Sequence, residues 1–235
     1  MNTAAFFDLD GTLLKSNIVE YYLYLASQGL SGVQRWGLTL QLWLKAPYYI
    51  MLDRWDRDRF NRTFYRNYRS MEFANCQKWS QTQFVNKIRP ALFPTALECI
   101  TKHQAAGRQI IFVTGSLDFI VAPITEFIGA DAMLTASLQI DQGKFTGEML
   151  SPPVAGEEKA RMMQSLALAR GIDLTASYAY ADSFADLPML QAVGHPVAVN
   201  PDARLQKIAQ KSGWAIADWK LDPINISSQE AKLQC

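Results

Sequence analysis

Short apolar runs alternate with helical patterns along most of the chain. The runs are rich in β-branched and aromatic residues and cover residues 4–9, 109–113, 176–181 and 196–199. Each run is short enough for a strand, and the segments between them have the longer apolar periodicity of helices. Strands that alternate with helices form a parallel sheet with helices on both faces, so we predict an α/β, Rossmann-like fold.

Local signals set the ends of several elements. Residues 94–106 form a predicted helix that stops at Gly107, because glycine adopts left-handed backbone conformations without strain. Asn200-Pro201-Asp202 supplies a capping side chain, a first-turn proline and an acid, which predict another helix. Alternating residues at 134–140 and 144–149 predict a hairpin on the sheet edge. From about residue 221 we expect a frayed tail.

Residues 15–84 differ in composition from the rest of the chain. They hold more than half of the aromatic residues and contain no convincing parallel strand. We therefore predict a small α-helical domain inserted into a core built from residues 1–14 and 85–235. Within the insert, residues 36–52 are strongly apolar but fall short of the roughly 20 residues that cross a bilayer. We interpret them as a packed helix followed by the start of another, and contact with a membrane surface is the alternative.

The bulk composition narrows the class of protein. The 235 residues include 23 basic and 22 acidic ones, so no overall field attracts nucleic acid or an anionic membrane. The three cysteines, Cys76, Cys99 and Cys235, lack the paired spacing of a metal or redox site, and we expect reduced thiols. The first residues show no secretion signal, so a cytoplasmic protein is expected.

Two acids follow the first predicted strand. Asp8 and Asp10 are separated by one residue and precede Gly11. Because the strand ends here, both carboxylates can turn to the carboxyl edge of the sheet, where open α/β sheets bind ligands. Gly11 would let backbone N–H groups approach a phosphate closely. An acidic turn without chemistry is the plainer interpretation of this segment alone.

Further candidate residues follow the later strands. Thr114 and Gly115 end the second strand and can offer a hydroxyl and an N–H group to a phosphate, while Ser116 would cap the next helix. Lys159, near the start of a later helix, could neutralise the charge of a transferring phosphoryl group or could be an ordinary surface lysine.

A second acidic pair follows the third strand. Asp182 and Asp186 lie where the strand gives way to a helix, and Asp182 would join Asp8 around one hard cation. Mg²⁺ suits this set, because it binds few carboxylates, keeps several waters and accepts a phosphate oxygen. The loop lacks the alternating ligands of a calcium-binding hand.

Together these four segments resemble the motifs of the haloacid dehalogenase-like phosphatase superfamily. The chain has Asp8-Leu9-Asp10-Gly11-Thr12, the Thr114 turn, Lys159 and the Asp182–Asp186 loop in the family's order. The resemblance extends from residue 6 to about 219. More narrowly, the set is similar to subfamily IB, which contains phosphoserine phosphatase and carries a small helical cap after the first motif.

The resemblance implies a mechanism. Asp8 would attack phosphorus and form an aspartyl-phosphate, and Asp10 would act first as acid and then as base. Mg²⁺ would bind Asp8, the backbone carbonyl of Asp10, Asp182 and the phosphate. Thr114, Gly115 and Lys159 would hold the remaining phosphate oxygens, with Asp186 positioning Lys159.

Two departures from the family pattern bear on the substrate. Asn17 stands where phosphoserine phosphatases place a glutamate that holds the substrate amine, and Ser183-Phe184-Ala185-Asp186 replaces their Gly-x-Asn-Asp. We expect a small phosphorylated metabolite other than phosphoserine. The alternatives are a lipid phosphate of the phosphatidylglycerophosphate type, cleaved at a membrane surface, and a binding protein without activity.

Other charged residues receive smaller roles. Arg54, Arg62 and Arg69 are candidate contacts for a second anionic group of the substrate. The aromatic residues of the insert could form its own core or accommodate a bulky apolar leaving group. His103 and His195 are expected to be surface histidines without a catalytic role.

Overall fold

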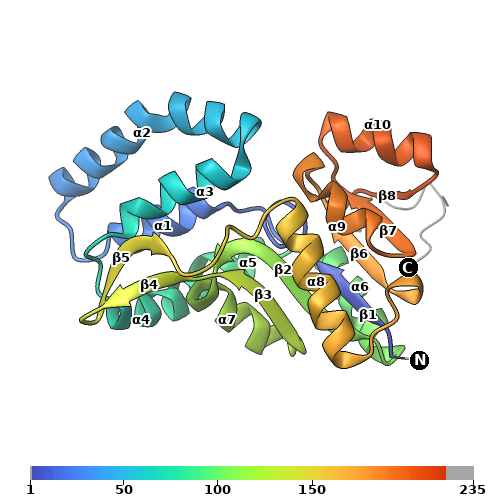
Figure 1. The fold of residues 1–235 in the computed structure, drawn as a ribbon. Coiled ribbons are helices and arrows are strands. Elements are labelled where there is room, and N and C mark those ends of the chain that lie inside the picture. The colour runs from blue at the N-terminus through green and yellow to red at the C-terminus, as the bar shows by residue number, and fades with distance from the viewer. Residues whose placement is uncertain (1, 221–235) are drawn as a thin grey trace.

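The computed structural model describes residues 2–220, and the predicted tail after 221 lies outside this range. At its centre is a parallel sheet of six strands in the order β3-β2-β1-β6-β7-β8 (Figure 1). This arrangement confirms the parallel sheet expected from the alternating pattern. Its strands are β1 (Ala4–Phe7), β2 (Gln109–Leu117), β3 (Ala132–Ala136), β6 (Tyr178–Ala181), β7 (His195–Val199) and β8 (Ala215–Ala217).

Strand β1 occupies the middle of the sheet. It pairs with β2 on one side and with β6 on the other, with Phe7 beside Phe112 and Tyr180. All four of its residues are buried, because helices cover both faces of the sheet. The carboxyl ends of β1, β2 and β6 therefore meet at one edge.

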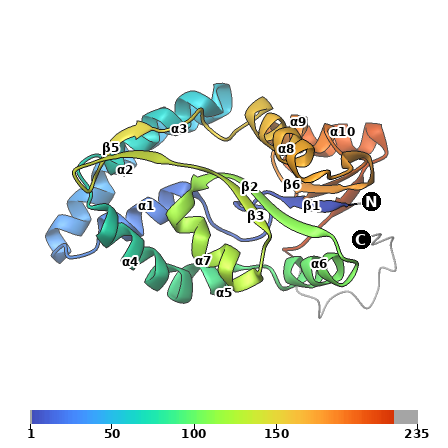
Figure 2. The same cartoon turned by 60° about the horizontal axis from the view of Figure 1, so that its bottom comes forward.

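Helices cover the sheet on both sides, as predicted. Figure 2 shows α6 and α7 on one side and α8, α9 and α10 on the other. The predicted helix 94–106 is confirmed, with Gly107 in a left-handed conformation at φ 71°. These helices are α5 (Arg89–Ala91), α6 (Pro94–Ala105), α7 (Asp118–Ile128), α8 (Glu157–Arg170), α9 (Leu187–Gln191) and α10 (Ala203–Ser212).

Helix α10 begins two residues later than the sequence signal suggested. Asp202 is its N-cap and accepts hydrogen bonds from the backbone N–H groups of Arg204 and Leu205. The side chain of Asn200 instead bridges distant backbone groups, donating to the carbonyl of Gly11 and accepting from the N–H of Trp219. A residue predicted as a local cap therefore ties the last strands to the loop after β1.

The predicted hairpin forms only in part, because residues 134–136 of its first arm belong to β3 of the main sheet, and the hairpin does not lie on the edge of that sheet. Strands β4 (Leu138–Asp141) and β5 (Lys144–Met149) make a separate two-stranded sheet. Backbone hydrogen bonds join Phe145 to Ser70 and Met71, and the buried Phe145 ring stacks against Phe119. The hairpin packs on helical residues because the apolar face of two strands alone is too small to be stable.

Extra helical elements follow β1. We call residues 18–88 the helical segment: α1 (Ile18–Ala26), α2 (Gly32–Trp55), α3 (Arg57–Tyr65) and α4 (Phe73–Gln83), followed by a π-helix, Phe84–Ile88. Edge-to-face contacts among Tyr22, Phe64 and Tyr68 form an aromatic core. The expectation that the aromatic residues build a core of their own is therefore correct for these rings.

Helix α2 departs from the prediction for residues 36–52. It is one continuous helix of 24 residues that runs through Pro47, rather than a helix and the start of another. It is also not packed on all sides, since Trp36, Trp43 and Trp55 are 71%, 74% and 82% exposed. None of the helices within residues 2–220 is long and apolar enough to cross a membrane.

His103 is buried, which corrects its prediction as a surface residue. Its Nε2 lies 2.7 Å from the hydroxyl of Tyr180, and Arg108 donates to its Nδ1 at 3.3 Å. Because arginine can only donate, Nδ1 is unprotonated and Nε2–H donates to Tyr180. Burial, followed by the charge of Arg108, lowers the pKa of His103 from 6.5 to about 4.

This lowered pKa predicts acid sensitivity. As the pH falls below about 6.5 the unfolded chain binds a proton at His103 before the folded protein does, so stability is lost towards pH 4. Between pH 7 and pH 5 the wild type should lose roughly 1–2 kcal/mol more unfolding free energy than His103→Gln. Urea unfolding with a chelator present measures this difference. Equal losses in both proteins would contradict the assignment.

Candidate active site

Asp8 begins the site directly after the central strand. Its backbone N–H donates to the carbonyl of Tyr180, which continues the pairing of β1 with β6 by one residue. The side chain is buried at the carboxyl edge, and Lys159 Nζ lies 2.6 Å from its Oδ1. The position agrees with the prediction that a carboxylate would face this edge.

Lys159 is not an ordinary surface lysine. It is 4% exposed, in the first turn of α8, and contacts Asp8 at 2.6 Å and Asp186 at 2.7 Å. Burial alone would lower its pKa, but the charges of Asp186 and Asp8 outweigh burial and hold the pKa above its usual value. The ammonium group is therefore charged and placed where anionic oxygens gather.

Asp182 completes an acidic cluster. One carboxylate oxygen each from Asp8, Asp182 and Asp186 lie within 4.8 Å of one another. The hydroxyl of Thr12 lies 3.3 Å from oxygens of both Asp8 and Asp182. Burial, and then the charge of neighbouring carboxylates, raises the pKa of Asp182. Three carboxylates facing one lysine leave excess negative charge, and their oxygens are the donors that a hard divalent cation prefers.

Asp10 has its side chain held apart from this cluster. Its Oδ1 accepts a hydrogen bond from the Tyr21 hydroxyl at 2.7 Å, and its Oδ2 accepts one from Ser116 Oγ at 2.6 Å. Burial raises the pKa of Asp10, and the two hydrogen bonds oppose that rise because they stabilise the carboxylate. The two hydrogen bonds fix the carboxyl group in place. Because burial and these hydrogen bonds shift its pKa in opposite directions, the group can both donate and accept a proton.

Ser116 corrects a sequence prediction. It was expected to cap the next helix, but β2 continues through Leu117, and its hydroxyl reaches Asp10 instead. Thr114 and Gly115 line the pocket as predicted. Thr114 Oγ1 accepts from the Ser116 N–H, which leaves its own proton available for donation.

Gly11 allows a sharp bend after β1 and a close contact that the sequence did not reveal. Its N–H donates to the carbonyl of Leu14, so it is engaged within its own turn. Its φ is 88°, and a Cβ atom there would lie 2.2 Å from Asp182 Oδ2. Glycine therefore lets the loop after β1 pass directly against a carboxylate of the cluster.

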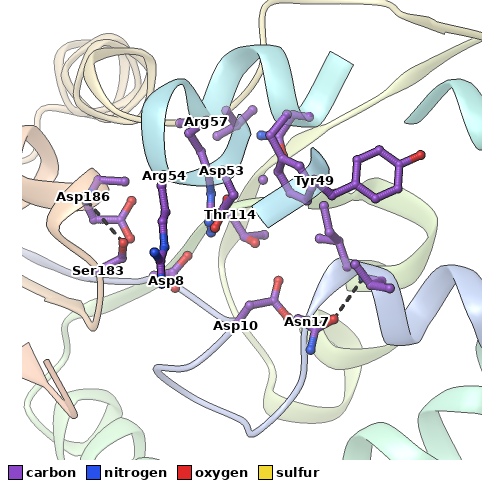
Figure 3. Close-up of a pocket in the computed structure, with 18 of the residues that line it drawn as sticks. Asp8, Asp10, Asn17, Tyr49, Asp53, Arg54, Arg57, Thr114, Ser183 and Asp186 are labelled. Atoms are coloured by element: carbon purple, nitrogen blue, oxygen red, sulfur yellow. Dashed lines mark hydrogen bonds and ion pairs between the residues drawn. The ribbon is translucent and has the colours of Figure 1, made fainter. Parts of the chain in front are cut away.

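The site opens into a pocket of about 470 Å³ between the sheet edge and the helical segment. Leu42, Tyr49 and Ile50 of α2 form an apolar wall. Figure 3 shows Arg54 and Arg57 extending into the pocket from α2 and α3. The pocket thus combines a polar floor with an apolar wall that carries two cations.

The arginines expected to contact a second anion differ in position. Arg54 lines the pocket, as predicted, together with Arg57, which had not been singled out and which pairs with Asp53. Arg69 is engaged elsewhere, donating to the backbone of Thr146, and Arg62 is not among the pocket's lining residues within the described chain. Helical spacing alone did not reveal which face of these helices meets the pocket.

Several residues at the site escaped the sequence analysis. Tyr21 reaches Asp10, Thr12 lies between two carboxylates, and the Tyr65 hydroxyl donates to the carbonyl of Gly115 at 2.5 Å. Thr12 stands inside the quoted motif and could have been found, whereas the two tyrosines carry no local signal. Asn17, which also lines the pocket, caps α1 by accepting from the N–H groups of Val19 and Glu20.

The sequence pattern of the haloacid dehalogenase-like hydrolase family matches residues 5–191. The chain belongs to this family. A probable phosphatase of Mycobacterium tuberculosis is 35% identical over 226 residues, which cover 91% of this chain and 74% of that protein. A histidinol-phosphatase of Neisseria meningitidis is 26% identical and is covered over its whole length, against 94% of this chain. The protein is a phosphatase of the haloacid dehalogenase-like family.

Solved structures support the same fold. A phospho-aspartyl intermediate analogue of phosphoserine phosphatase superposes with a TM-score of 0.66 and 19% identity, covering 96% of this chain and 97% of that one. The six-stranded core and the extra helical elements thus share the fold of that structure.

The close approach of Gly11 predicts a specific cost of substitution. Gly11→Ala should lower the free energy of unfolding by roughly 1–3 kcal/mol more than Gly29→Ala, measured by urea unfolding. Both glycines have positive φ, at 88° and 74°, but nothing lies within 4 Å of a Cβ at Gly29. Gly29→Ala therefore reports the backbone strain alone. Equal costs would show that Asp182 moves aside freely.

Proposed function

We propose that the protein is a Mg²⁺-dependent phosphomonoester hydrolase that works through an aspartyl-phosphate on Asp8. The observation that carries the proposal is the convergence of Asp8, Lys159, Asp182 and Asp186 at one sheet edge. Asp10 lies beside them with both oxygens hydrogen-bonded. Because all the residues of the predicted reaction converge, this geometry does not favour the alternative of an inactive binding protein.

The donor set fits a hard divalent cation. Asp8 and Asp182 supply carboxylate oxygens, and the backbone carbonyl of Asp10 is proposed as a further ligand, while Asp186 is already paired with Lys159. When bound, Mg²⁺ would offset the negative charge that otherwise repels an anionic phosphate from the carboxylate of Asp8.

In the first step an oxygen of Asp8 attacks phosphorus. The bond from phosphorus to the ester oxygen breaks as the bond to Asp8 forms, and Asp10 gives its proton to the leaving alkoxide. Lys159 and Thr114 hold phosphate oxygens, and the charge of Lys159 stabilises the transferring group. Burial raises the pKa of Asp10, which favours the protonated form that this donation needs.

In the second step water attacks the acyl phosphate. Asp10, now a carboxylate, takes a proton from the water, the bond from phosphorus to Asp8 breaks, and inorganic phosphate is released. The hydrogen bonds from Tyr21 and Ser116 stabilise the carboxylate form that this step needs.

We further propose that residues 15–84 act as a cap domain over a core of residues 1–14 and 85–235. Support comes from α2 and α3, which supply the pocket wall opposite the catalytic edge. A cap in this position would exclude water and select the leaving group. Working in the cytoplasm is also proposed, consistent with the free, buried thiol of Cys76.

The substrate is proposed to be a small phosphorylated metabolite other than phosphoserine. Asn17 carries no charge to hold an amine, and its side chain is engaged as a helix cap. The wall formed by Leu42, Tyr49 and Ile50 favours an apolar leaving group. The relative named as a histidinol-phosphatase is consistent with a substrate other than phosphoserine.

The nucleophile is tested by Asp8→Asn. This variant should lose phosphate release from an aryl phosphate by a factor on the order of 10³ or more, because an amide oxygen is a poor nucleophile. The wild type should lose activity with EDTA and regain it with Mg²⁺. Asp141→Asn, at the exposed end of β4, is the matched control, and circular dichroism checks folding. Full turnover by Asp8→Asn would eliminate the proposal.

The support of Asp10 is tested by Ser116→Ala. Loss of a hydrogen bond to a charged group, worth about 1.5–3 kcal/mol, should lower kcat roughly tenfold to a hundredfold. Ser137→Ala is the matched control, because Ser137 also donates to a carboxylate, that of Asp118, but outside the pocket. Steady-state kinetics with the same aryl phosphate compares the two. Similar kcat values for both variants would show that the hydrogen bond from Ser116 to Asp10 does not contribute to the reaction.

A further inference from the structure

Helix α2 presents an apolar face that the described chain leaves uncovered. Figure 1 shows it running along the outer side of the helical segment, away from the sheet. Its opposite face packs inward through Leu42 and Tyr49. Six large apolar residues on the outer face are between 43% and 85% exposed: Val33, Trp36, Leu40, Trp43, Leu44 and Trp55. They recur at helical spacing and form one continuous stripe, defined here as the outer face.

Charge around the outer face is positive. Residues 15–84 contain ten basic and five acidic residues, although the whole chain is nearly balanced at 23 and 22. Residues 31–52 contain two basic residues, Arg35 and Lys45, and no acid, and Arg35 and Arg54 are exposed along α2. A helix rich in tryptophan and leucine and bordered by cations has the composition of one that lies on an anionic lipid surface.

A second copy of the chain is a weaker candidate for the occupant. A symmetric dimer would bring the same surface of each copy together, and so would place one set of cations against the other. Repulsion of this kind opposes association, whereas an anionic bilayer neutralises the cations.

The helix that carries the outer face also forms part of the active-site pocket wall. Ile50 lines the pocket and is also 55% exposed, and the exposed Arg54 lines it as well. The pocket wall on this side is apolar through Leu42 and Tyr49. An apolar chain that leaves the pocket beside Ile50 would therefore meet exposed apolar surface of α2, with Arg54 one helical turn away.

We propose that the outer face of α2 docks on an anionic lipid bilayer, and that the pocket takes phosphate monoesters of amphiphiles from that surface. The substrate part of this inference rests on the proposed hydrolase reaction and replaces the small metabolite with an amphiphile as its substrate, whereas docking stands independently of catalysis. Apolar burial supplies the main contribution to binding, and the cations of the helical segment add an attraction that salt weakens.

Docking is tested by co-sedimentation with vesicles. The wild type should sediment with vesicles of phosphatidylcholine and phosphatidylglycerol, and less with phosphatidylcholine alone or at high salt. Trp36→Gln combined with Trp43→Gln should weaken binding by about tenfold or more. Leu150→Gln combined with Leu168→Gln, at equally exposed apolar positions elsewhere, should not change it. Docking is overturned if the wild type does not sediment with the vesicles, or if the tryptophan variant binds them as well as the wild type. It is also overturned if the protein forms a dimer that depends on these tryptophans and binds no vesicles.

Catalysis is measured in parallel. With a soluble aryl phosphate the tryptophan variant should keep the kcat/KM of the wild type, because neither tryptophan lines the pocket. With lysophosphatidic acid in anionic vesicles it should be slower by about the same factor as its binding. If the wild type and the tryptophan variant cleave lysophosphatidic acid in the vesicles at equal rates, the proposal that the pocket takes amphiphiles from the bilayer is overturned. If the wild type binds vesicles but cleaves no phosphate ester, the proposed function fails and docking is still supported.

Discussion

Several like charges are buried together at the carboxyl edge of the sheet, and this constraint organises the rest of the site. Asp8, Asp182 and Asp186 lie within 4.8 Å of one another with Lys159 as their cation. Carboxylates removed from water are costly unless positive charge and hydrogen bonds compensate them. Such a cluster persists because the fold holds it in place, and it favours any ligand that brings positive charge, such as a divalent metal ion.

The fold holds the cluster through contacts that span long sequence distances. Gly11 lets the loop after β1 pass against Asp182, and Asn200 ties that same loop to the last strands. Lys159 comes from the start of α8, and the partners of Asp10 come from α1 and β2. Every strand of the sheet centre therefore contributes to one small volume, so a change in the register of any of them would separate the reacting groups.

The helical segment has two surfaces with different properties. Its inner surface closes the pocket with apolar side chains and two arginines, while its outer surface exposes the tryptophans of α2. Part of each surface belongs to α2, and this shared helix would couple the choice of substrate to whatever the outer surface contacts. This coupling is the physical reason for linking an amphiphilic substrate to a lipid surface.

The sequence by itself determined the parallel sheet, four of its strands and the acidic residues at their ends. These features follow from local periodicity, and the ends of neighbouring parallel strands converge whatever the rest of the chain does. Only the tertiary structure decided that Ser116 and Tyr21 hold Asp10, that His103 is buried against Tyr180, and that one face of α2 is exposed. Such features depend on which surfaces meet across long sequence separations. Local sequence patterns do not specify these long-range contacts.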